Sequence, residues 1–336
     1  MNQHAFDPDA AGDPDSGIFG LPHARADSRV ILIPVPFDAT TSYGHGTARG
    51  PAAILDASRQ VDLFDRRMGR VYERGIYMEP EEAWVAGLSA DARALAAPII
   101  ERGGGGVGDA RALAAIEAAG ERVAALTFER ARAVLREGKV PGLVGGDHST
   151  PLGAIRACAE TGPMGILHVD AHMDMRDAFE GFRYSHASIM WNVMATVPGV
   201  TRLVQVGIRD MGEGEIRAAR EHGDRVRTHF DDLWAEAMLA GTRFAELVSG
   251  AIDALPERVY VSFDIDGLDP SLCPNTGTPV PGGLSFNQAS LLLDALRRSG
   301  RVIMGFDLVE VCPGADGGAW DANVGARILY KLCGLA

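Results

Sequence analysis

The sequence has few cysteines, no leader-like start and no long hydrophobic run, and each of these absences excludes a class of protein. The four cysteines (Cys158, Cys273, Cys312 and Cys333) are scattered and form no CxxC pair. This pattern argues against a disulfide framework and indicates a reducing, cytoplasmic compartment. The polar, acidic N-terminus does not resemble a signal peptide, and we expect no membrane-spanning segment and no membrane partner.

The sequence also has fewer basic than acidic residues. The chain contains 32 Lys and Arg against 45 Asp and Glu, which gives a formal net charge of -13. Proteins that bind nucleic acid or anionic membranes need basic patches, so we expect neither partner. An acidic protein instead attracts cationic small molecules toward an acidic cleft.

The order of apolar and polar segments predicts an arm followed by a single α/β domain. Residues 1–27 are rich in Asp, Pro, Gly and Ala and predict a flexible arm, whereas residues 28–336 predict one domain with a large core. Short apolar strands alternate with helices, which is typical of a parallel sheet covered on both faces. Strands are expected at 29–35, 140–144, 165–169, 202–206, 258–263 and 302–306. Helices are expected near 51–64, 110–137, 151–160, 186–195, 213–222, 242–254, 286–299 and 320–333.

Polar residues follow four of these strands, at the carboxyl ends where ligands bind in open α/β sheets. The segments are GGDHS (145–149), DAHMD (170–174), DIDGLDP (264–270) and DLVE (307–310). A single aspartate after a strand is usually a helix cap or a turn residue. Several carboxylates at one sheet edge, however, repel each other and raise each other's pKa unless a cation neutralises them. The pattern therefore predicts a metal site.

The candidate ligands are four aspartates and two histidines: His148, Asp170, His172, Asp174, Asp264 and Asp266. Six ligands are too many for one structural zinc ion and suit two divalent ions that share bridging carboxylates. Oxygen-rich ligation with two imidazoles favours manganese. Two divalent ions would balance the four carboxylates and let a shared water ionise near neutral pH.

Three segments, GGDHS, DAHMD and SFDIDGLDPSLCPNTGTPVPGG, resemble the motif blocks of the ureohydrolase family, which contains arginase, agmatinase, guanidinobutyrase and formimidoylglutamase. The resemblance runs from about Ile31 to the C-terminus. It implies an arginase-like three-layer α/β/α fold with a mostly parallel sheet, a homotrimer or homohexamer, and two Mn²⁺ per chain, with Ni²⁺ as an alternative. It also implies the ligands of each ion. One ion would be held by His148, Asp170, Asp174 and Asp264, and the other by Asp170, His172, Asp264 and Asp266.

The resemblance implies the reaction as well. Activated water attacks the guanidinium carbon, and urea and an amine are released. Asp174 would orient the attacking hydroxide, and His186, in the SHAS segment, matches a histidine thought to shuttle protons. Glu310, in GFDLVEVCP, matches the glutamate that pairs with the guanidinium, a planar cation that a carboxylate can bind through two N–H groups.

The sequence defines the part of the substrate beyond the guanidino group, its tail, less well. Arg176 stands where arginase has an asparagine, whereas DMRDAFEG and SHAS resemble prokaryotic agmatinases. We therefore favour agmatine, cleaved to putrescine and urea, which implies a role in polyamine metabolism. An arginine at this place also resembles formimidoylglutamase, so a guanidino acid, free guanidine, arginine or formiminoglutamate stay open as substrates.

Three residues near the cleft have open roles. Arg176 and Arg183 could form a salt bridge to Asp177 or Glu180, a subunit contact, or, as substrate-binding residues, an anchor for a carboxylate. His45 could line the cleft mouth or be a solvated loop residue. Two other classes are open in addition, a single-zinc deacetylase of the same fold and a non-catalytic partner subunit. The intact set of six ligands argues against both.

Overall fold

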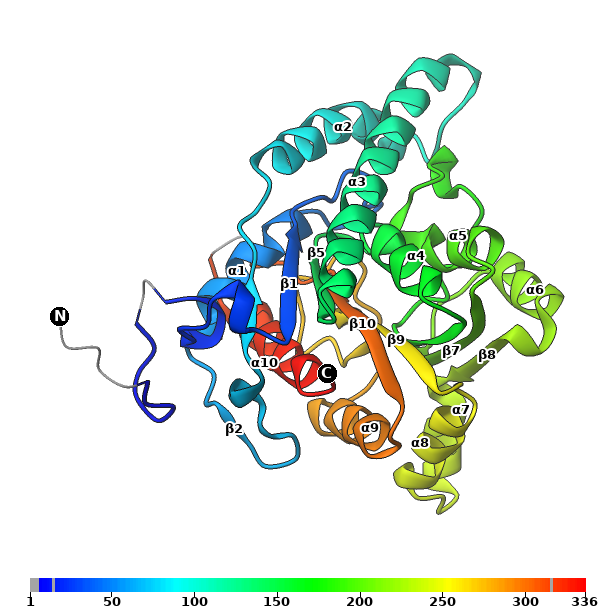
Figure 1. The fold of residues 1–336 in the computed structure, drawn as a ribbon. Coiled ribbons are helices and arrows are strands. Elements are labelled where there is room, and N and C mark those ends of the chain that lie inside the picture. Colours follow the sequence, from blue (N-terminus) through cyan, green and yellow to red (C-terminus); the bar gives the residue numbers. More distant parts are fainter. Residues whose placement is uncertain (1–5, 14–15, 315–316) are drawn as a thin grey trace.

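The fold is built on one eight-stranded sheet whose strands are all parallel (Figure 1). A computed structural model describes residues 6–13, 16–314 and 317–336. The strands in sheet order are β4 (Ile76–Met78), β1 (Val30–Val35), β5 (Val140–Gly145), β10 (Val302–Val309), β9 (Arg258–Asp264), β6 (Met164–Val169), β7 (Val200–Ile208) and β8 (Val226–Phe230). Two further short strands, β2 (Phe64–Asp65) and β3 (Gly69–Arg70), form a separate antiparallel pair.

Helices cover both faces of this sheet and confirm the expected three-layer α/β/α architecture. One face carries α1 (Gly50–Ser58), α7 (Asp231–Leu239), α8 (Phe244–Asp253), α9 (Phe286–Arg298) and α10 (Trp320–Cys333). The other face carries α3 (Ala110–Arg136), α4 (Leu152–Glu160), α5 (Ile189–Thr196) and α6 (Glu213–Glu221), with α2 (Ala83–Glu101) packed on α3.

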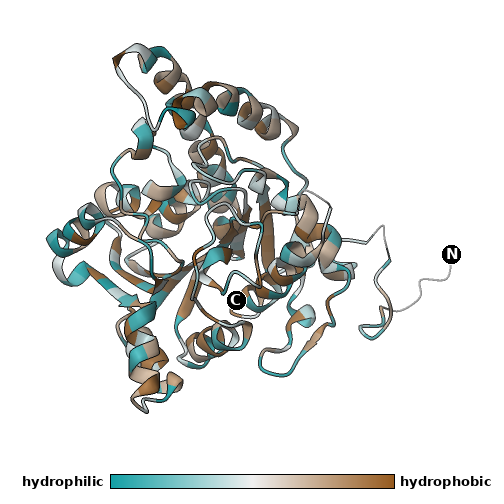
Figure 2. Ribbon diagram, turned by 180° about the vertical axis from the view of Figure 1, so that it is seen from behind, coloured by the Kyte–Doolittle hydropathy of each residue, from teal (hydrophilic) through white to brown (hydrophobic). Residues whose placement is uncertain are grey.

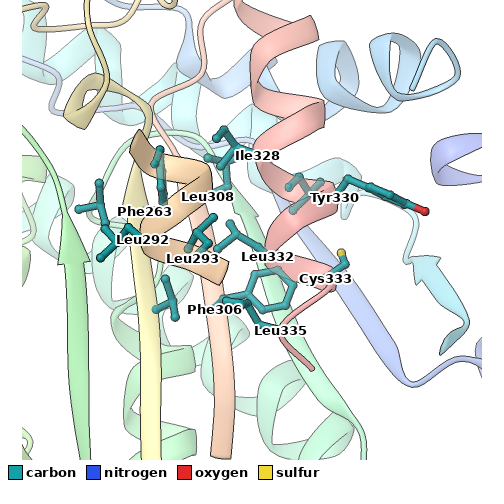
Figure 3. Close-up of a cluster of buried hydrophobic side chains, with 14 of the residues drawn as sticks. Phe263, Leu292, Leu293, Phe306, Leu308, Ile328, Tyr330, Leu332, Cys333 and Leu335 are labelled. Atoms are coloured by element: carbon teal, nitrogen blue, oxygen red, sulfur yellow. The ribbon is translucent and has the colours of Figure 1, made fainter. Parts of the chain in front are cut away.

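The strands form at these positions because their residues are apolar on both faces. Every residue of β1, β5 and β6 is buried, as expected for a parallel sheet between two helix layers. Figure 2 shows hydrophobic strands in the middle of the molecule and hydrophilic residues on the outer turns of the helices. In one core cluster (Figure 3), apolar side chains of β9 and β10 pack against those of α9 and α10, among them Phe263, Phe306, Leu293, Ile328 and Leu332.

Each strand expected from the sequence is present, but the structure adds elements that the sequence did not predict. The edge strands β4 and β8 are short or partly polar, because an edge strand has only one neighbour to bury it. Helices α2 and α7 were also not expected. By length and composition alone α2 is apolar enough to cross a membrane. In this fold it packs against α3 through a buried stripe that includes Val85, Ala92 and Ala96.

The N-terminal segment is more ordered than expected. Ile18, Phe19 and Leu21 are buried in the core between α1 and α10. The ring of Phe19 meets that of Tyr330 at a centroid distance of 4.9 Å, and its backbone N–H donates to Ser58 Oγ (2.8 Å). The prediction of a flexible arm over residues 1–27 is therefore wrong for residues 18–21, whose apolar side chains gain from burial. Residues 1–5 and 14–15 lie outside the described part of the chain.

A pair of glycine substitutions tests the close packing of α3 on α4. A Cβ at Gly153 of α4 would lie 1.9 Å from the carbonyl oxygen of Ala124 in α3, whereas nothing lies within 4 Å of a Cβ at Gly87 of α2. We expect Gly153→Ala to lower the free energy of unfolding by roughly 1–3 kcal/mol or more, because the helices must separate. Gly87→Ala should raise it by about 0.5–1 kcal/mol, because alanine favours the helix. Thermal unfolding measures both, and equal melting temperatures for the two variants would contradict this packing.

Candidate metal centre

The candidate ligands follow four strands that are neighbours in the sheet, in the order β5, β10, β9 and β6. His148 follows β5, and Glu310 comes directly after β10. Asp264 is the last residue of β9, and Asp170 comes directly after β6. Because the strands are parallel, these residues meet at the carboxyl edge of the sheet, as the sequence predicted.

One group of side chains is centred on His148. Its Nδ1 lies 3.0 Å from Asp170 Oδ2, 3.1 Å from Asp174 Oδ2 and 3.2 Å from Asp264 Oδ2. All four side chains are buried, and this nitrogen has no hydrogen-bond partner among the described residues. A buried, unsatisfied nitrogen that faces three carboxylate oxygens fits a bound cation, which would satisfy all of these atoms at once.

A second group is centred on His172. Its Nδ1 lies 3.1 Å from Asp266 Oδ2 and 3.4 Å from Asp170 Oδ1. Asp170 therefore directs one oxygen to each group, as a bridging carboxylate would. Asp264 belongs to the first group, and its Oδ1 accepts a hydrogen bond from the backbone N–H of Asp266 (2.8 Å). The second bridge expected from Asp264 stays a prediction.

The pKa values in this cluster indicate that it needs positive charge. Burial and the neighbouring Asp170 raise the pKa of Asp174 to about 7. Burial, Asp266 and Asp170 raise the pKa of Asp264 well above its ordinary value. Burial alone would lower the pKa of His148, but the three facing carboxylates outweigh burial and raise it well above its ordinary value. Protons supply the charge that these carboxylates demand, and divalent cations would supply it in their place.

Several residues that sequence reasoning missed orient the ligands. Ser262 Oγ lies 2.9 Å from His148 Nε2 and donates to Asp307 Oδ1 (3.1 Å). Because the hydroxyl proton goes to Asp307, Ser262 must accept a proton from Nε2. The lone pair of His148 then lies on Nδ1, toward the carboxylates, which is the tautomer that binds a metal.

His168 has the equivalent role on β6. Its Nε2 lies 2.8 Å from Asp170 Oδ2, and Gln205 Nε2 lies 3.1 Å from its Nδ1. The sequence does carry a signal for His168 and Ser262. Each stands two residues before an aspartate ligand on its strand, and alternate residues of a strand face the same side.

Two site residues have unusual backbone conformations. Asp174 (φ 54°) and Glu310 (φ 62°) both occupy the left-handed region. Such a conformation costs on the order of 1–3 kcal/mol in a residue other than glycine and persists only where neighbours fix it. The Asp174 carbonyl accepts two backbone hydrogen bonds, from Met190 and Trp191. Glu310 donates its N–H to the Gly146 carbonyl (2.8 Å).

The Glu310 side chain is buried, and among the described residues only one of its two carboxylate oxygens has a hydrogen-bond partner. Its Oε1 accepts a hydrogen bond from the backbone N–H of His148 (3.0 Å), whereas Oε2 has no hydrogen-bond partner among the described residues. Burial, followed by the nearby Asp264 and Asp147, raises the pKa of Glu310 well above its ordinary value. A bound cation would restore the ionised form, and a planar guanidinium could donate to the free oxygen.

A small cavity opens beside the two groups. Its volume is about 140 Å³, well below that of the usual site for a drug-sized ligand, and it suits a small linear molecule. His172, Asp174, His186 and Arg176 line it together with Ser42, Phe179, Asp210, Glu215 and Thr278. The ring of His186 is held by Ser42 Oγ, 3.1 Å from Nε2. Burial, with His172 and His148 nearby, lowers the pKa of His186 to about 3, so the ring is neutral at pH 7.

The arginines make ion pairs other than those expected. Arg176 Nε lies 3.2 Å from Glu215 Oε2, and its guanidinium lies over the ring of Phe179 at 4.6 Å. Arg183 Nη1 lies 3.3 Å from Glu117 Oε1. The prediction that these arginines pair with Asp177 or Glu180 is therefore wrong. The true partners are far apart in the chain and could not be found by local spacing.

His45 was expected either at the cleft mouth or in solvent. Its side chain is exposed. Within the described part of the chain it is not among the residues that line this cavity. The structure therefore supports the interpretation of His45 as a solvated loop residue.

Comparisons with known proteins agree with this geometry. Residues 28–334 match the sequence profile of the Arginase family. The chain is 35% identical over 316 residues to N(1)-aminopropylagmatine ureohydrolase of Thermus thermophilus, covering 92% of this chain and 90% of that protein. It superposes on proclavaminate amidinohydrolase of Streptomyces clavuligerus with a TM-score of 0.70 and 27% identity, covering 97% and 98% of the two chains. The agmatine ureohydrolase of Thermoplasma volcanium shares the fold, with a TM-score of 0.69, 23% identity and coverage of 94% and 92%.

Proposed function

The chain belongs to the arginase family, whose members are binuclear metal-dependent hydrolases, and we propose that it cleaves agmatine or an N-alkylated agmatine to urea and an amine. Cleavage of a C–N bond in a guanidino compound is the reaction class of this family. For agmatine the amine product is putrescine, which would give the enzyme a role in polyamine metabolism. The observation that carries the proposal is the pairing of the two His/Asp groups with Glu310 at one sheet edge.

We propose two Mn²⁺ per chain, with Ni²⁺ as the alternative. His148, Asp170, Asp174 and Asp264 would hold one ion, and Asp170, His172, Asp264 and Asp266 the other. The unsatisfied His148 Nδ1 and the excess of buried carboxylates support this assignment. When bound, two divalent ions neutralise the carboxylates and lower the pKa of a shared water, so that it ionises near neutral pH.

The protein side chains would then bind and orient the substrate. Glu310 Oε2 would accept a hydrogen bond from the guanidinium and position its carbon over the sheet edge. Asp174 would accept a hydrogen bond from the attacking water and orient it. His186, neutral and within the cavity wall, would take a proton and deliver it to the leaving amine or to solvent.

The charges near the cavity favour an ammonium tail. Arg176 already pairs with Glu215, whereas the exposed Asp210 has no ion-pair partner among the described residues. An uncompensated carboxylate at the cavity wall attracts a cation. A guanidino acid is the second candidate, because the outer nitrogens of Arg176 still have donors for a carboxylate and a relative, proclavaminate amidinohydrolase, is 38% identical over 197 residues.

We also propose that the enzyme is a cytoplasmic homotrimer or homohexamer. The scattered, unpaired cysteines support the compartment, and the family resemblance supports the assembly. Membership of the arginase family argues against a single-zinc deacetylase, and the intact set of six candidate ligands argues against a non-catalytic subunit.

A substrate panel tests the proposal. Enzyme loaded with Mn(II), and separately with Ni(II), would be assayed for urea release from agmatine, arginine, 4-guanidinobutyrate, guanidinoacetate and free guanidine. Formiminoglutamate would be assayed for formamide. We expect kcat/KM for agmatine to exceed that for each acid by about tenfold or more, the equivalent of one uncompensated charge contact. Turnover of an acid alone would overturn the amine assignment and make Arg176 the carboxylate anchor.

A further inference from the structure

The segment that follows β1, residues 36–49, contributes Ser42 to the wall of the small cavity. The hydroxyl of Ser42 lies 3.1 Å from Nε2 of His186, which lines the same cavity. Among the described residues, His186 is the only hydrogen-bond partner of this hydroxyl. The Ser42 side chain therefore contacts the histidine of the proposed proton transfer and the space in which the substrate would lie.

The backbone on both sides of Ser42 is fixed by other parts of the fold. One residue before it, the carbonyl oxygen of Thr41 accepts a hydrogen bond from Arg93 Nη1 of helix α2 (2.6 Å). Two residues after it, Gly44 donates its backbone N–H to the carbonyl oxygen of Gly277 (2.9 Å). These contacts place the hydroxyl of Ser42 without any help from His186, so Ser42 can hold the imidazole ring in place.

The other ring nitrogen decides in which direction this hydrogen bond runs. Nδ1 of His186 lies 3.8 Å from Glu310 Oε1, an oxygen that already acts as an acceptor, for the backbone N–H of His148 (3.0 Å). A neutral imidazole carries a single N–H. With that N–H on Nε2, the lone pair of Nδ1 would face the acceptor oxygen and be repelled, whereas an N–H on Nδ1 is attracted to it. Ser42 therefore donates its O–H to Nε2.

We propose that Ser42 is a positioning residue for His186, whose imidazole it holds in the Nδ1–H tautomer with the basic Nε2 at the cavity wall. This inference rests on the proposed function, in which His186 takes a proton and delivers it to the leaving amine. A ring that could turn would be aligned for proton transfer only part of the time, and small errors of alignment are costly. The hydroxyl suits both states of the ring, because it donates to the bare nitrogen and, after rotation, accepts from the protonated one.

The test compares kcat and KM for the best substrate of the panel, with each variant loaded with the same metal. Ser42→Ala should lower kcat about tenfold, the equivalent of one lost hydrogen bond, and change KM by less than about twofold, because Ser42 holds the histidine and not the guanidino group. Ser42→Thr retains the hydroxyl and should recover kcat to within about threefold of the wild type. Metal content per chain should stay at the wild-type value in every variant.

Thr40→Val is the matched control. It also removes one hydroxyl from this segment, but among the described residues that hydroxyl contacts only the carbonyl oxygen of Tyr184, at 3.4 Å. We expect kcat of Thr40→Val to stay within about twofold of the wild type.

A double-mutant cycle separates the positioning of His186 from a general effect on the fold. His186→Ala alone should lower kcat about a hundredfold or more, the usual contribution of a general acid or base. In that background Ser42→Ala should change kcat by less than about twofold, because no ring is left to position.

The outcomes distinguish this inference from the proposed function. Wild-type kcat in Ser42→Ala, an equal loss in Thr40→Val, no recovery in Ser42→Thr, or an undiminished loss in the His186→Ala background would each overturn the role of Ser42 and leave the proposed function standing. Loss of metal from Ser42→Ala would also overturn it, because the effect would then be structural. No urea from any substrate with the wild-type enzyme would overturn the proposed function, and the role of Ser42 with it.

Discussion

Asp266→Ala is expected to bind one divalent ion per chain in place of two and to lose turnover by about a thousandfold or more. Asp266 Oδ2 lies 3.1 Å from His172 Nδ1, and its Oδ1 accepts the backbone N–H of Ala171 (3.0 Å). The substitution therefore removes a ligand from the second group and also the contact that joins β9 to the loop after β6. The first group, centred on His148, keeps all of its members.

Metal content per chain, measured by mass spectrometry of the dialysed protein, and urea release with the best substrate of the panel test this expectation. Asp269→Ala is the matched control, because Asp269 lies in the same segment but, among the described residues, its carboxylate bonds only the neighbouring Ser271. The control should keep two ions and wild-type turnover. Two ions bound to Asp266→Ala would show that residues other than the second group hold the second ion.

Glu310→Gln is expected to keep both ions but to lower kcat/KM by roughly thirtyfold to several thousandfold. The glutamine retains an oxygen that can accept the His148 N–H, so the neighbouring ligand stays in place. It removes the negative charge on the free oxygen, and loss of one partner of a buried charge pair costs about 2–5 kcal/mol. Glu310→Ala should lose guanidine binding in the same way.

Steady-state kinetics with metal analysis separates this role from a metal role. Loss of turnover with two ions still bound identifies Glu310 as a substrate contact. Normal turnover of Glu310→Ala would show that the guanidinium binds elsewhere, and loss of one ion would make Glu310 part of the metal centre.

The sequence predicted the core of the fold because its central strands are apolar on both faces. Strands β5, β6, β9 and β10 are mostly apolar, with few polar residues such as His168, Ser262 and Asp307, and could be placed to within a few residues. Edge strand β8 could not, since its sequence VRTHF mixes polar and apolar residues. Helix α7 begins with two aspartates and buries only Trp234, so its periodicity is weak. Residues 18–21 were misassigned because the composition of the whole segment concealed three residues that the core buries, Ile18, Phe19 and Leu21.

The site was predictable to the extent that its residues lie next to strand ends. The two His/Asp groups follow directly from this placement, and the structure brings them within contact distance. The hydrogen-bond and ion-pair partners of the site residues cannot be deduced from their position at the strand ends. The Ser262–Asp307 contact joins two different strands, and Glu215 reaches the loop residue Arg176 from helix α6, so both contacts needed the three-dimensional structure.

Strand β10 lies between β5 and β9, although it is the last strand in the chain. His148 and Asp264 therefore stand on opposite sides of a strand that the ribosome makes after both β5 and β9. Until residue 309 has left the exit tunnel, no strand connects β5 to β9. The incomplete sheet then exposes the unpaired edges of these two strands to other nascent chains. A chain that stops before β10 cannot gather the two halves of its metal-binding edge, so we expect metal to be acquired only after β10 has been made.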